Sequence, residues 1–186
     1  DKCTRNFYDQ SVQIRATKLV AAERGYETVM KKLQTPTPVY DGKKVAIVGG
    51  GPTGMAAAYF CARAGIPTTL FEKENVLGGI VRQVIPAFRI SDEAIEKDAA
   101  IMKKMGVEVK LGAPAPAVEE LKKQGYTHIL FAVGAWKAGK LDIAGNVKPV
   151  ISWMKDVKAG KVEPLGHVAV IGGGNTAMDA ARLALR

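Results

Sequence analysis

Short apolar runs alternate with amphipathic stretches along most of this chain, and this pattern defines the expected elements. Runs such as Val45–Val48 and Thr68–Phe71 are typical of strands buried on both faces of a parallel sheet. The expected strands are 45–48, 68–71, 107–111, 127–133 and 167–171. The expected helices are 1–34 with a break at Gly25, 55–64, 91–105, 117–124 and 178–185. This alternation predicts an α/β fold with a doubly wound parallel sheet, preceded by a helical segment and followed by the start of a second Rossmann-like unit.

A glycine-rich turn follows the first apolar run. Gly49, Gly51 and Gly54 form the pattern G-x-G-x-x-G between strand 45–48 and the next helix. The first glycine permits a tight bend, the second lets the backbone approach a pyrophosphate, and the third lets the helix pack against the strand. The second run ends at Glu72, roughly 20 positions after Gly49, where an acid accepts hydrogen bonds from a ribose diol. This stretch therefore predicts a dinucleotide-binding site.

The segment 75–89 shows no clear period and is expected to be a loop. It contains the pair Gly78-Gly79 and several arginines, among them Arg89. Loops of this composition beside a nucleotide site often wrap the ligand, and the alternative is a plain surface connection. Ser91 is the expected N-cap of the helix that follows.

A second strand, glycine turn and helix are expected near the end of the chain. The run 167–171 leads into Gly172-Gly173-Gly174-Asn175-Thr176-Ala177, in which Ala177 replaces the third glycine, a recognised variant. Two fingerprints predict two dinucleotide sites. The second has no following strand before Arg186, so we expect a fragment of a larger enzyme. Because no completed sheet is available to them, residues 167–186 are expected to be mobile or to be ordered only by neighbours.

Composition narrows the class of protein without changing this picture. Apolar residues make up 47% of the chain and charged residues 24%, as in ordinary globular proteins. The net charge is +9, but the lysines and arginines are spread along the chain and interleaved with acidic residues. No nucleic-acid-binding motif is present in the sequence, so no nucleic-acid partner is expected. No apolar run approaches the ~20 residues of a membrane span. Two distant cysteines, Cys3 and Cys61, make no disulfide framework, which favours a cytoplasmic protein.

Several motifs beyond the glycine turns are shared with one family. They are, in chain order, Val48–Ala58, Phe71-Glu72-Lys73, Gly78-Gly79, Ile85-Pro86-Ala87-Phe88-Arg89, Phe131-Ala132-Val133-Gly134, Pro164-Leu165-Gly166 and Ile171–Arg182. In these motifs, and across essentially its whole length, the chain resembles the glutamate synthase small-subunit family. This family includes the NADPH–FAD half of dihydropyrimidine dehydrogenase and the flavoprotein part of putative selenate reductases. Generic Rossmann proteins lack the Ile-Pro-x-Phe-Arg and Gly-Gly-Gly-Asn-Thr-Ala-x-Asp elements. The chain departs from the family at Gln83-Val84, where Tyr-Gly is usual, and at Ser91, where proline is common.

The resemblance implies an NAD(P)H-dependent, FAD-containing oxidoreductase, in which electrons pass from NADPH to FAD and leave through iron–sulfur clusters. It places FAD at the first fingerprint, with Glu72 at the adenosine ribose, and NADPH at the second. The candidate cofactor-binding residues are Gly49, Gly51, Pro52, Thr53, Gly54, Glu72, Lys73, Gly78, Gly79, Arg89, Ala132 and Gly134 for FAD, and Gly172, Gly174, Asn175 and Thr176 for NADPH. No catalytic side chain is expected, because the cofactors perform the chemistry. The implied partners are iron–sulfur, amidotransferase or reductase domains of the parent enzyme.

The resemblance also gives Cys3 two interpretations. The family's cysteine-rich N-terminal region carries [4Fe–4S] clusters, and Cys3 lies roughly where the last ligand is expected. One thiolate cannot hold a cluster that takes four, so Cys3 is either an orphan ligand or an ordinary free thiol. Cys61, inside the helix after the first fingerprint, is expected to pack in the core.

The expected domain organisation has three parts. Residues 1–40 form a helical segment and linker, 41–145 the N-terminal part of an FAD-binding domain, and 146–186 a crossover with the first strand, turn and helix of an NADPH-binding domain. Two other functions stay open on the sequence alone. One is a dehydrogenase with a single NAD(P) cofactor, and the other is an inactive fragment or docking scaffold that binds neither cofactor productively.

Overall fold

The computed structural model describes residues 3–39, 42–139, 141–161 and 165–186. The chain forms two units, Asp1–Gln34 and Thr35–Arg186. Pro164, part of one family motif, lies outside the described residues. Within the described ranges, no helix is both long and apolar enough to cross a membrane.

The first unit consists of a short 3-10 helix and one long helix. The helix η1 spans Thr4–Phe7 and α1 spans Ile14–Lys32, and neither contains a buried residue. The expected break at Gly25 is wrong, because α1 runs through this residue without interruption. A single glycine costs a helix about 1 kcal/mol relative to alanine, which lowers its stability without ending it.

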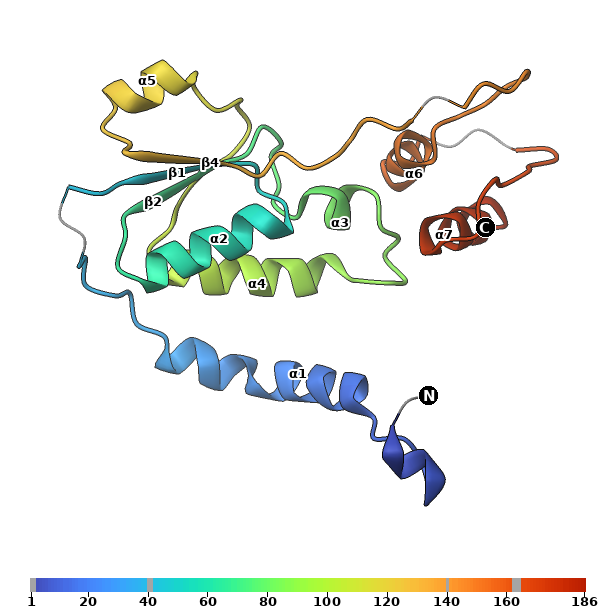
Figure 1. Ribbon diagram of the computed structural model, residues 1–186, viewed down its shortest axis with the longest axis horizontal. Coiled ribbons are helices and arrows are strands. Elements are labelled where there is room, and N and C mark those ends of the chain that lie inside the picture. The colour runs from blue at the N-terminus through green and yellow to red at the C-terminus, as the bar shows by residue number, and fades with distance from the viewer. Residues whose placement is uncertain (1–2, 40–41, 140, 162–164) are drawn as a thin grey trace. The chain divides into compact units, whose positions relative to one another are not determined.

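The second unit is built on a four-stranded parallel sheet. Its strands are β1 (Val45–Val48), β2 (Thr68–Phe71), β3 (Glu108–Lys110) and β4 (His128–Phe131). Their order is β3-β2-β1-β4 (Figure 1). Ile47 is level with Leu70 of β2 on one side and with Leu130 of β4 on the other. The chain moves outward from β1 to β3 and then returns to the opposite side of β1. This reversal creates a crevice beyond the carboxyl ends of β1 and β4, where ligands of open α/β sheets bind.

Helices cover both faces of the sheet, which confirms the doubly wound α/β fold. Figure 1 shows α2 (Pro52–Arg63) and α4 (Asp92–Lys104) on one face and α5 (Val118–Lys123) on the other. Strand residues alternate between these layers, as the pleat requires. Ala46 and Phe71 pack with Leu121 and Tyr126 on the α5 side. The predicted N-cap of α4 is confirmed, because the Ser91 hydroxyl accepts a hydrogen bond from the backbone N–H of Ala94.

The segment expected to be a loop contains the short helix α3, Gly79–Gln83, so that expectation was wrong in part. Gly78 is the N-cap of this helix and Gly79 its first residue, and their φ angles of +109° and +52° are ones that only glycine adopts readily. A helix of about one turn is too short to show a helical period in the sequence.

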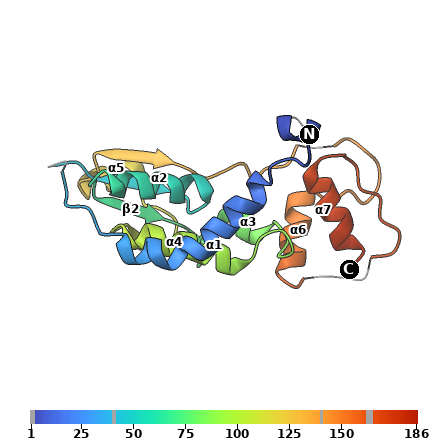
Figure 2. The same cartoon turned by 90° about the horizontal axis from the view of Figure 1, so that it is seen from below.

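Two more helices follow the sheet and pack on each other. They are α6 (Val150–Lys158) and α7 (Asn175–Ala184), which lie side by side in Figure 2. Met154 and Ala180 join Val84 in a small buried core, which draws α7 toward the segment after α3. The expected strand 167–171 is absent, although the helix expected after it is present. A strand needs a neighbour for its backbone hydrogen bonds, and the described sheet ends at β4.

Candidate cofactor-binding site

The first glycine turn joins β1 to α2 with almost no space between them. Gly49 has a φ of +113°, and a β-carbon on it would overlap the backbone of Ala132 at the end of β4. A β-carbon on Gly54 would overlap the carbonyl oxygen of Gly49. Gly51 differs, because a β-carbon there would meet only the Cα of Gly79, at 3.9 Å. Gly49 and Gly54 therefore permit the close packing of the turn, and Gly51 leaves the outer side of the turn open.

Glu72 lies at the end of β2 and is held by the turn itself. Its Oε2 accepts a hydrogen bond from the backbone N–H of Gly50 at 2.6 Å, and its Oε1 accepts one from the backbone N–H of Glu74 at 2.9 Å. Only 8% of the residue is exposed. A carboxylate offers about four acceptor positions. Glu72 is therefore fixed in orientation and retains acceptor capacity for hydroxyl donors of a ligand.

The start of α3 lies against the same turn. The backbone N–H of Gly78 donates to the carbonyl oxygen of Gly50 at 2.8 Å. A β-carbon on Gly79 would lie 2.9 Å from the Cα of Gly51, so no side chain fits at this position. The predicted glycine pair thus brings the segment after Glu72 directly to the fingerprint.

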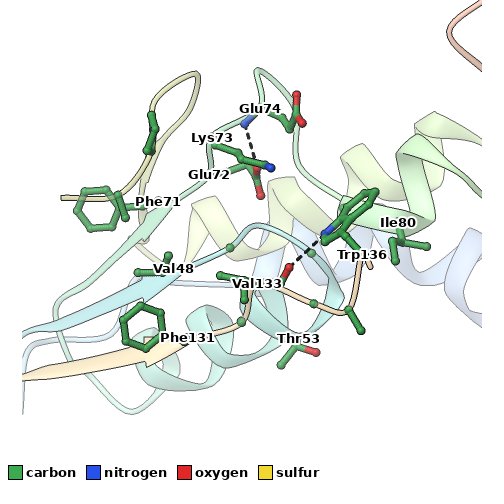
Figure 3. A pocket seen from close by; sticks show the side chains of 18 of the residues that line it. Val48, Thr53, Phe71, Glu72, Lys73, Glu74, Ile80, Phe131, Val133 and Trp136 are labelled. Carbon is green, nitrogen blue, oxygen red and sulfur yellow. Dashed lines mark hydrogen bonds between the residues drawn. The ribbon is translucent and has the colours of Figure 1, made fainter. Parts of the chain in front are cut away.

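A cavity of about 760 Å³ opens at the carboxyl ends of the strands (Figure 3). Its volume is within the range of ligand pockets, about 300–1,000 Å³. The candidate FAD-binding residues that line it are Gly49, Gly51, Pro52, Thr53, Glu72, Lys73, Gly79, Ala132 and Gly134. Gly54 and Gly78 do not line it but act behind the wall, through the contacts described above. The turn, the acid and the end of β4 therefore face one space.

The cavity wall also contains residues that the sequence did not indicate. They are Pro114, Ala115 and Pro116 after β3, Phe131 in β4, Ile80 and Gln83 in α3, and Trp136. Figure 3 shows Ile80 and Trp136 on one side of the pocket and Phe71 and Phe131 on the other. The indole N–H of Trp136 donates to the carbonyl oxygen of Val133 at 3.1 Å, which fixes the ring. The sequence could have indicated these wall residues only by their position, because each of their segments follows or ends a strand or follows the glycine pair.

Arg89 does not line this cavity. Its guanidinium is paired with Asp179 of α7. The expected place of Arg89 along the flavin therefore stays a prediction.

The candidate NADPH residues lie apart from the cavity. Gly172, with a φ of +133°, and Gly174 precede α7, and Asn175 and Thr176 form its exposed first turn. β-carbons on Gly173 and Gly174 would meet no atom within 4 Å. The structure thus has the turn and helix of the second fingerprint in an open setting, without the strand that would complete it.

The two cysteines differ in their surroundings. Cys3 is the N-cap of η1, and backbone N–H groups, those of Val12 and Arg5 foremost, lower the pKa of its thiol. Within the described ranges, no group of three or more His, Cys, Asp or Glu side chains is placed to hold a metal ion. Cys61 is half-buried in α2, and burial raises the pKa of its thiol.

Comparison with known families agrees with this geometry. Residues 43–186 match the family described as pyridine nucleotide-disulphide oxidoreductase. The chain belongs to this family. The family expected from the motifs, oxidoreductases that use FAD and NAD(P), is thereby confirmed.

The known proteins that resemble this chain are much longer than it. The putative oxidoreductase YgfK of Escherichia coli strain K12 is 42% identical over 189 residues, which cover 99% of this chain and 18% of that protein. The NADPH-Fe(3+) oxidoreductase subunit beta of Geobacter sulfurreducens is 33% identical over 198 residues, which cover 99% of this chain and 29% of that protein. Among solved structures, a 2-naphthoyl-CoA reductase complex matches with a TM-score of 0.64 and 28% identity, over 79% of this chain and 22% of that one. The chain therefore spans less than a third of each of these relatives.

The cavity fits the dinucleotide that the family uses. The open face of Gly51 leaves room for a pyrophosphate beside the start of α2, where backbone N–H groups favour anions. Glu72 has acceptors for a ribose, and the wall on either side of the turn is mostly apolar. An arrangement of this kind is suited to binding and orienting a cofactor.

Proposed function

We propose that this chain is the flavin-binding part of an oxidoreductase that passes electrons from NADPH to FAD and on to an iron–sulfur partner. The observation that carries the proposal is the carboxylate of Glu72, fixed by the fingerprint turn inside the cavity at the reversal of the sheet. Bound FAD would supply the acceptor for a hydride and the means to release single electrons. The iron–sulfur partner rests on the family resemblance, and the name of the Geobacter relative includes both NADPH and iron.

The chain's own residues would bind and orient the cofactor. Gly51, Pro52 and Thr53 would contact the pyrophosphate, and Glu72 the adenosine ribose. Ala132 and Gly134 would support the cofactor from the end of β4, and the indole of Trp136 would exclude water from one side. Gly172, Gly174, Asn175 and Thr176 would contact the phosphates of NADPH in the parent enzyme.

The open setting of the second fingerprint favours a narrower function for the isolated chain. With no strand formed over 167–171, we expect NADPH to bind the chain weakly, while FAD binds at the first site, whose cavity the described residues line. A dehydrogenase with a single NAD(P) cofactor is the other candidate, because an acid after the second strand also suits NAD.

Titration of the purified chain with FAD, and then with NADPH without oxygen, tests the proposal. We expect one equivalent of FAD to bind with shifted absorption bands. The matched variant is Gly51→Ala, whose methyl group enters the open side of the turn at an ordinary φ of −75°. We expect it to fold like the wild type and to lose FAD affinity, whereas Gly139→Ala, with no neighbour within 4 Å, changes neither property. Binding of NAD(P) at this site in place of FAD would contradict the proposal.

A further inference from the structure

We propose that Lys155 is a positioning residue of the cofactor site, which holds two parts of the cavity wall at the separation that FAD requires. The inference rests on the proposed function and deepens it. Lys155 belongs to α6, and its Nζ lies 3.4 Å from Oε1 of Glu74 and 5.4 Å from the ring centre of Trp136. Glu74 and Trp136 are among the described residues that line the cavity, and Lys155 is not. Lys155 therefore acts on a ligand through these two side chains.

The two contacts of Lys155 lie on opposite sides of the central strand β1. Glu74 follows β2, Trp136 follows β4, and β1 lies between these two strands. Figure 3 shows Glu74 and Trp136 on different segments of the pocket wall. Two strand spacings of about 4.8 Å separate β2 from β4, a gap that the two contacts of Lys155 can bridge. The ammonium therefore joins the two flanks of the cavity, the segment at Glu74 and the segment at Trp136.

The backbone hydrogen bonds of the sheet do not fix the separation of these flanks, because Glu74 and Trp136 both lie outside the strands. The backbone N–H of Glu74 donates to Oε1 of Glu72 at 2.9 Å, and the indole N–H of Trp136 donates to the carbonyl oxygen of Val133 at 3.1 Å. Each of these hydrogen bonds stays within one flank. Lys155 provides a polar contact between the flanks, and a shift of Glu74 would also disturb the acid that faces the ribose.

The helix α6 is anchored firmly enough to support Lys155. Met154, beside it, is 2% exposed and belongs to the apolar core that α6 shares with α7. One turn later, the Lys158 ammonium donates to the carbonyl oxygen of Ile85 at 2.7 Å. Residues three or four positions apart share a helix face, so Lys155 and Lys158 extend from the same side of α6. The cation between the flanks thus comes from a fixed helix.

A bound cofactor strengthens the contacts of Lys155. The side chains of Lys155 and Glu74 are 42% and 36% exposed, so water weakens their attraction in the free chain. A ligand in the cavity displaces water from the inner side of Glu74 and Trp136, and charges attract each other more strongly where less water surrounds them. Loss of the ammonium therefore destabilises the bound state more than the free state, which is the condition for an effect on affinity.

Lys155→Met tests this role, because methionine keeps an unbranched stem and removes the ammonium. We expect FAD to bind it about threefold to tenfold more weakly, since each of the two contacts is weak at a half-exposed site. Lys155→Arg, which keeps a cation for both contacts, should bind FAD nearly as the wild type does. The matched control is Lys122→Met on α5, which removes the same charge from an exposed pair with Glu119 and should leave FAD affinity unchanged.

Variants of Glu74 separate positioning from direct attraction between the ammonium and the anionic FAD. Positioning predicts that Glu74→Met also weakens FAD binding, and that the double variant with Lys155→Met is no weaker than the weaker single variant. Direct attraction predicts the opposite for Glu74→Met, because removal of a carboxylate favours an anion. FAD affinity of Glu74→Met at or above that of the wild type would overturn the inference and leave the proposed function intact.

Acrylamide quenching of tryptophan fluorescence gives a second measurement that needs no cofactor. With Trp153→Phe as the background, Trp136 is the remaining tryptophan of the chain. We expect Lys155→Met to increase the quenching of Trp136, because the indole loses one of its contacts, and Lys122→Met to leave it unchanged. Equal quenching with and without Lys155 would overturn the inference alone. Failure of the wild type to bind FAD would overturn the proposed function and, with it, the role of Lys155.

Discussion

Arg89 and Asp179 form an ion pair between segments that are 90 positions apart in the chain. The Nε of Arg89 donates to Oδ1 of Asp179 at 2.7 Å, and Nη2 lies 2.6 Å from the same oxygen. Beside the pair, the guanidinium groups of Arg182 and Arg186 lie 4.2 Å and 4.5 Å from the ring centre of Phe88. The Ile-Pro-x-Phe-Arg and Gly-Gly-Gly-Asn-Thr-Ala-x-Asp motifs, on which the sequence resembles the glutamate synthase small-subunit family, are therefore in direct contact.

Asp179→Asn should weaken the attachment of α7. The carboxylate is largely buried, and its loss leaves Arg89 with one neutral acceptor, so we expect the free energy of unfolding to fall by about 1–2 kcal/mol. The half-exposed guanidinium keeps the effect below that of a fully buried pair. Urea unfolding measures the change. The control Glu93→Gln breaks an exposed, solvent-screened pair with Lys97 and should lower the free energy of unfolding much less. If the two variants lowered the free energy of unfolding equally, the Arg89–Asp179 pair would stabilise the fold no more than an exposed ion pair does.

Gly54→Ala should prevent the normal fold or destabilise it by about 3 kcal/mol, since its methyl group would overlap the backbone oxygen of Gly49. A backbone atom in a tight turn cannot move aside as a flexible side chain does. Gly139→Ala adds the same methyl group where no atom lies within 4 Å and should leave the unfolding midpoint unchanged. The urea midpoints of the two variants test this prediction. A Gly54→Ala variant of normal stability would refute the packing role of this glycine.

Glu72→Gln should weaken FAD binding about tenfold. Both carboxylate oxygens of Glu72 accept hydrogen bonds from backbone N–H groups. In the glutamine variant, the side-chain NH₂ group would face one of these N–H donors and could not accept its hydrogen bond. The resulting loss of one charge-assisted hydrogen bond is worth roughly 1.5–3 kcal/mol, shared between the turn and the ligand. Calorimetric titration with FAD measures the affinity. Glu119→Gln, which alters an exposed pair with Lys122 on α5, serves as the control, and a comparable loss of affinity there would contradict the role of Glu72.

Cys3 should react with iodoacetamide faster than Cys61 at neutral pH. Backbone N–H groups lower the pKa of the Cys3 thiol, so more of it is thiolate, whereas burial raises the pKa of Cys61 and also shields it. As pH rises, the rate for Cys3 should level off first. Mass spectrometry of the two peptides over a pH series measures both rates, and the unfolded chain provides the reference in which they should converge.

Amide hydrogen exchange should separate the two parts of the C-terminal segment. Val168, Val170 and Ile171 are exposed and outside any strand, so we expect their amides to exchange quickly. The amides of α7 around Ala180 should exchange more slowly, because this helix is buried against α6. The expectation of a wholly mobile segment 167–186 would be supported by fast exchange throughout. Slow exchange at 168–171 would contradict both expectations.

The parts of the fold that the sequence predicted correctly depend on local chemistry. The turn after β1, the acid after β2 and the cap at Ser91 each follow from residues that are close together in the chain. The wrong expectations concern elements that depend on distant partners or on small energy differences. The run 167–171 is apolar enough for a strand but has no neighbour in the described sheet, and Gly25 costs too little to end α1.

The candidate site shows the same division. Nine residues of the predicted FAD site line the cavity, because the fingerprint and the strand ends define its floor. Gln83 and Trp136 were missed as wall residues, since nothing local determines which loops close over the crevice. Arg89 was expected at the flavin, and its contact with Asp179 required a partner from another motif.

The position of β4 at one edge of the described sheet affects how the chain behaves in concentrated solution. Leu130 and Phe131 are 42% and 60% exposed there, and Val133 follows them at 57%. An edge with free backbone groups and apolar side chains is a template for strand addition by another molecule. Two copies that pair along β4 would extend one sheet into the next, so self-association should increase with protein concentration and set the upper limit for quantitative work with this chain.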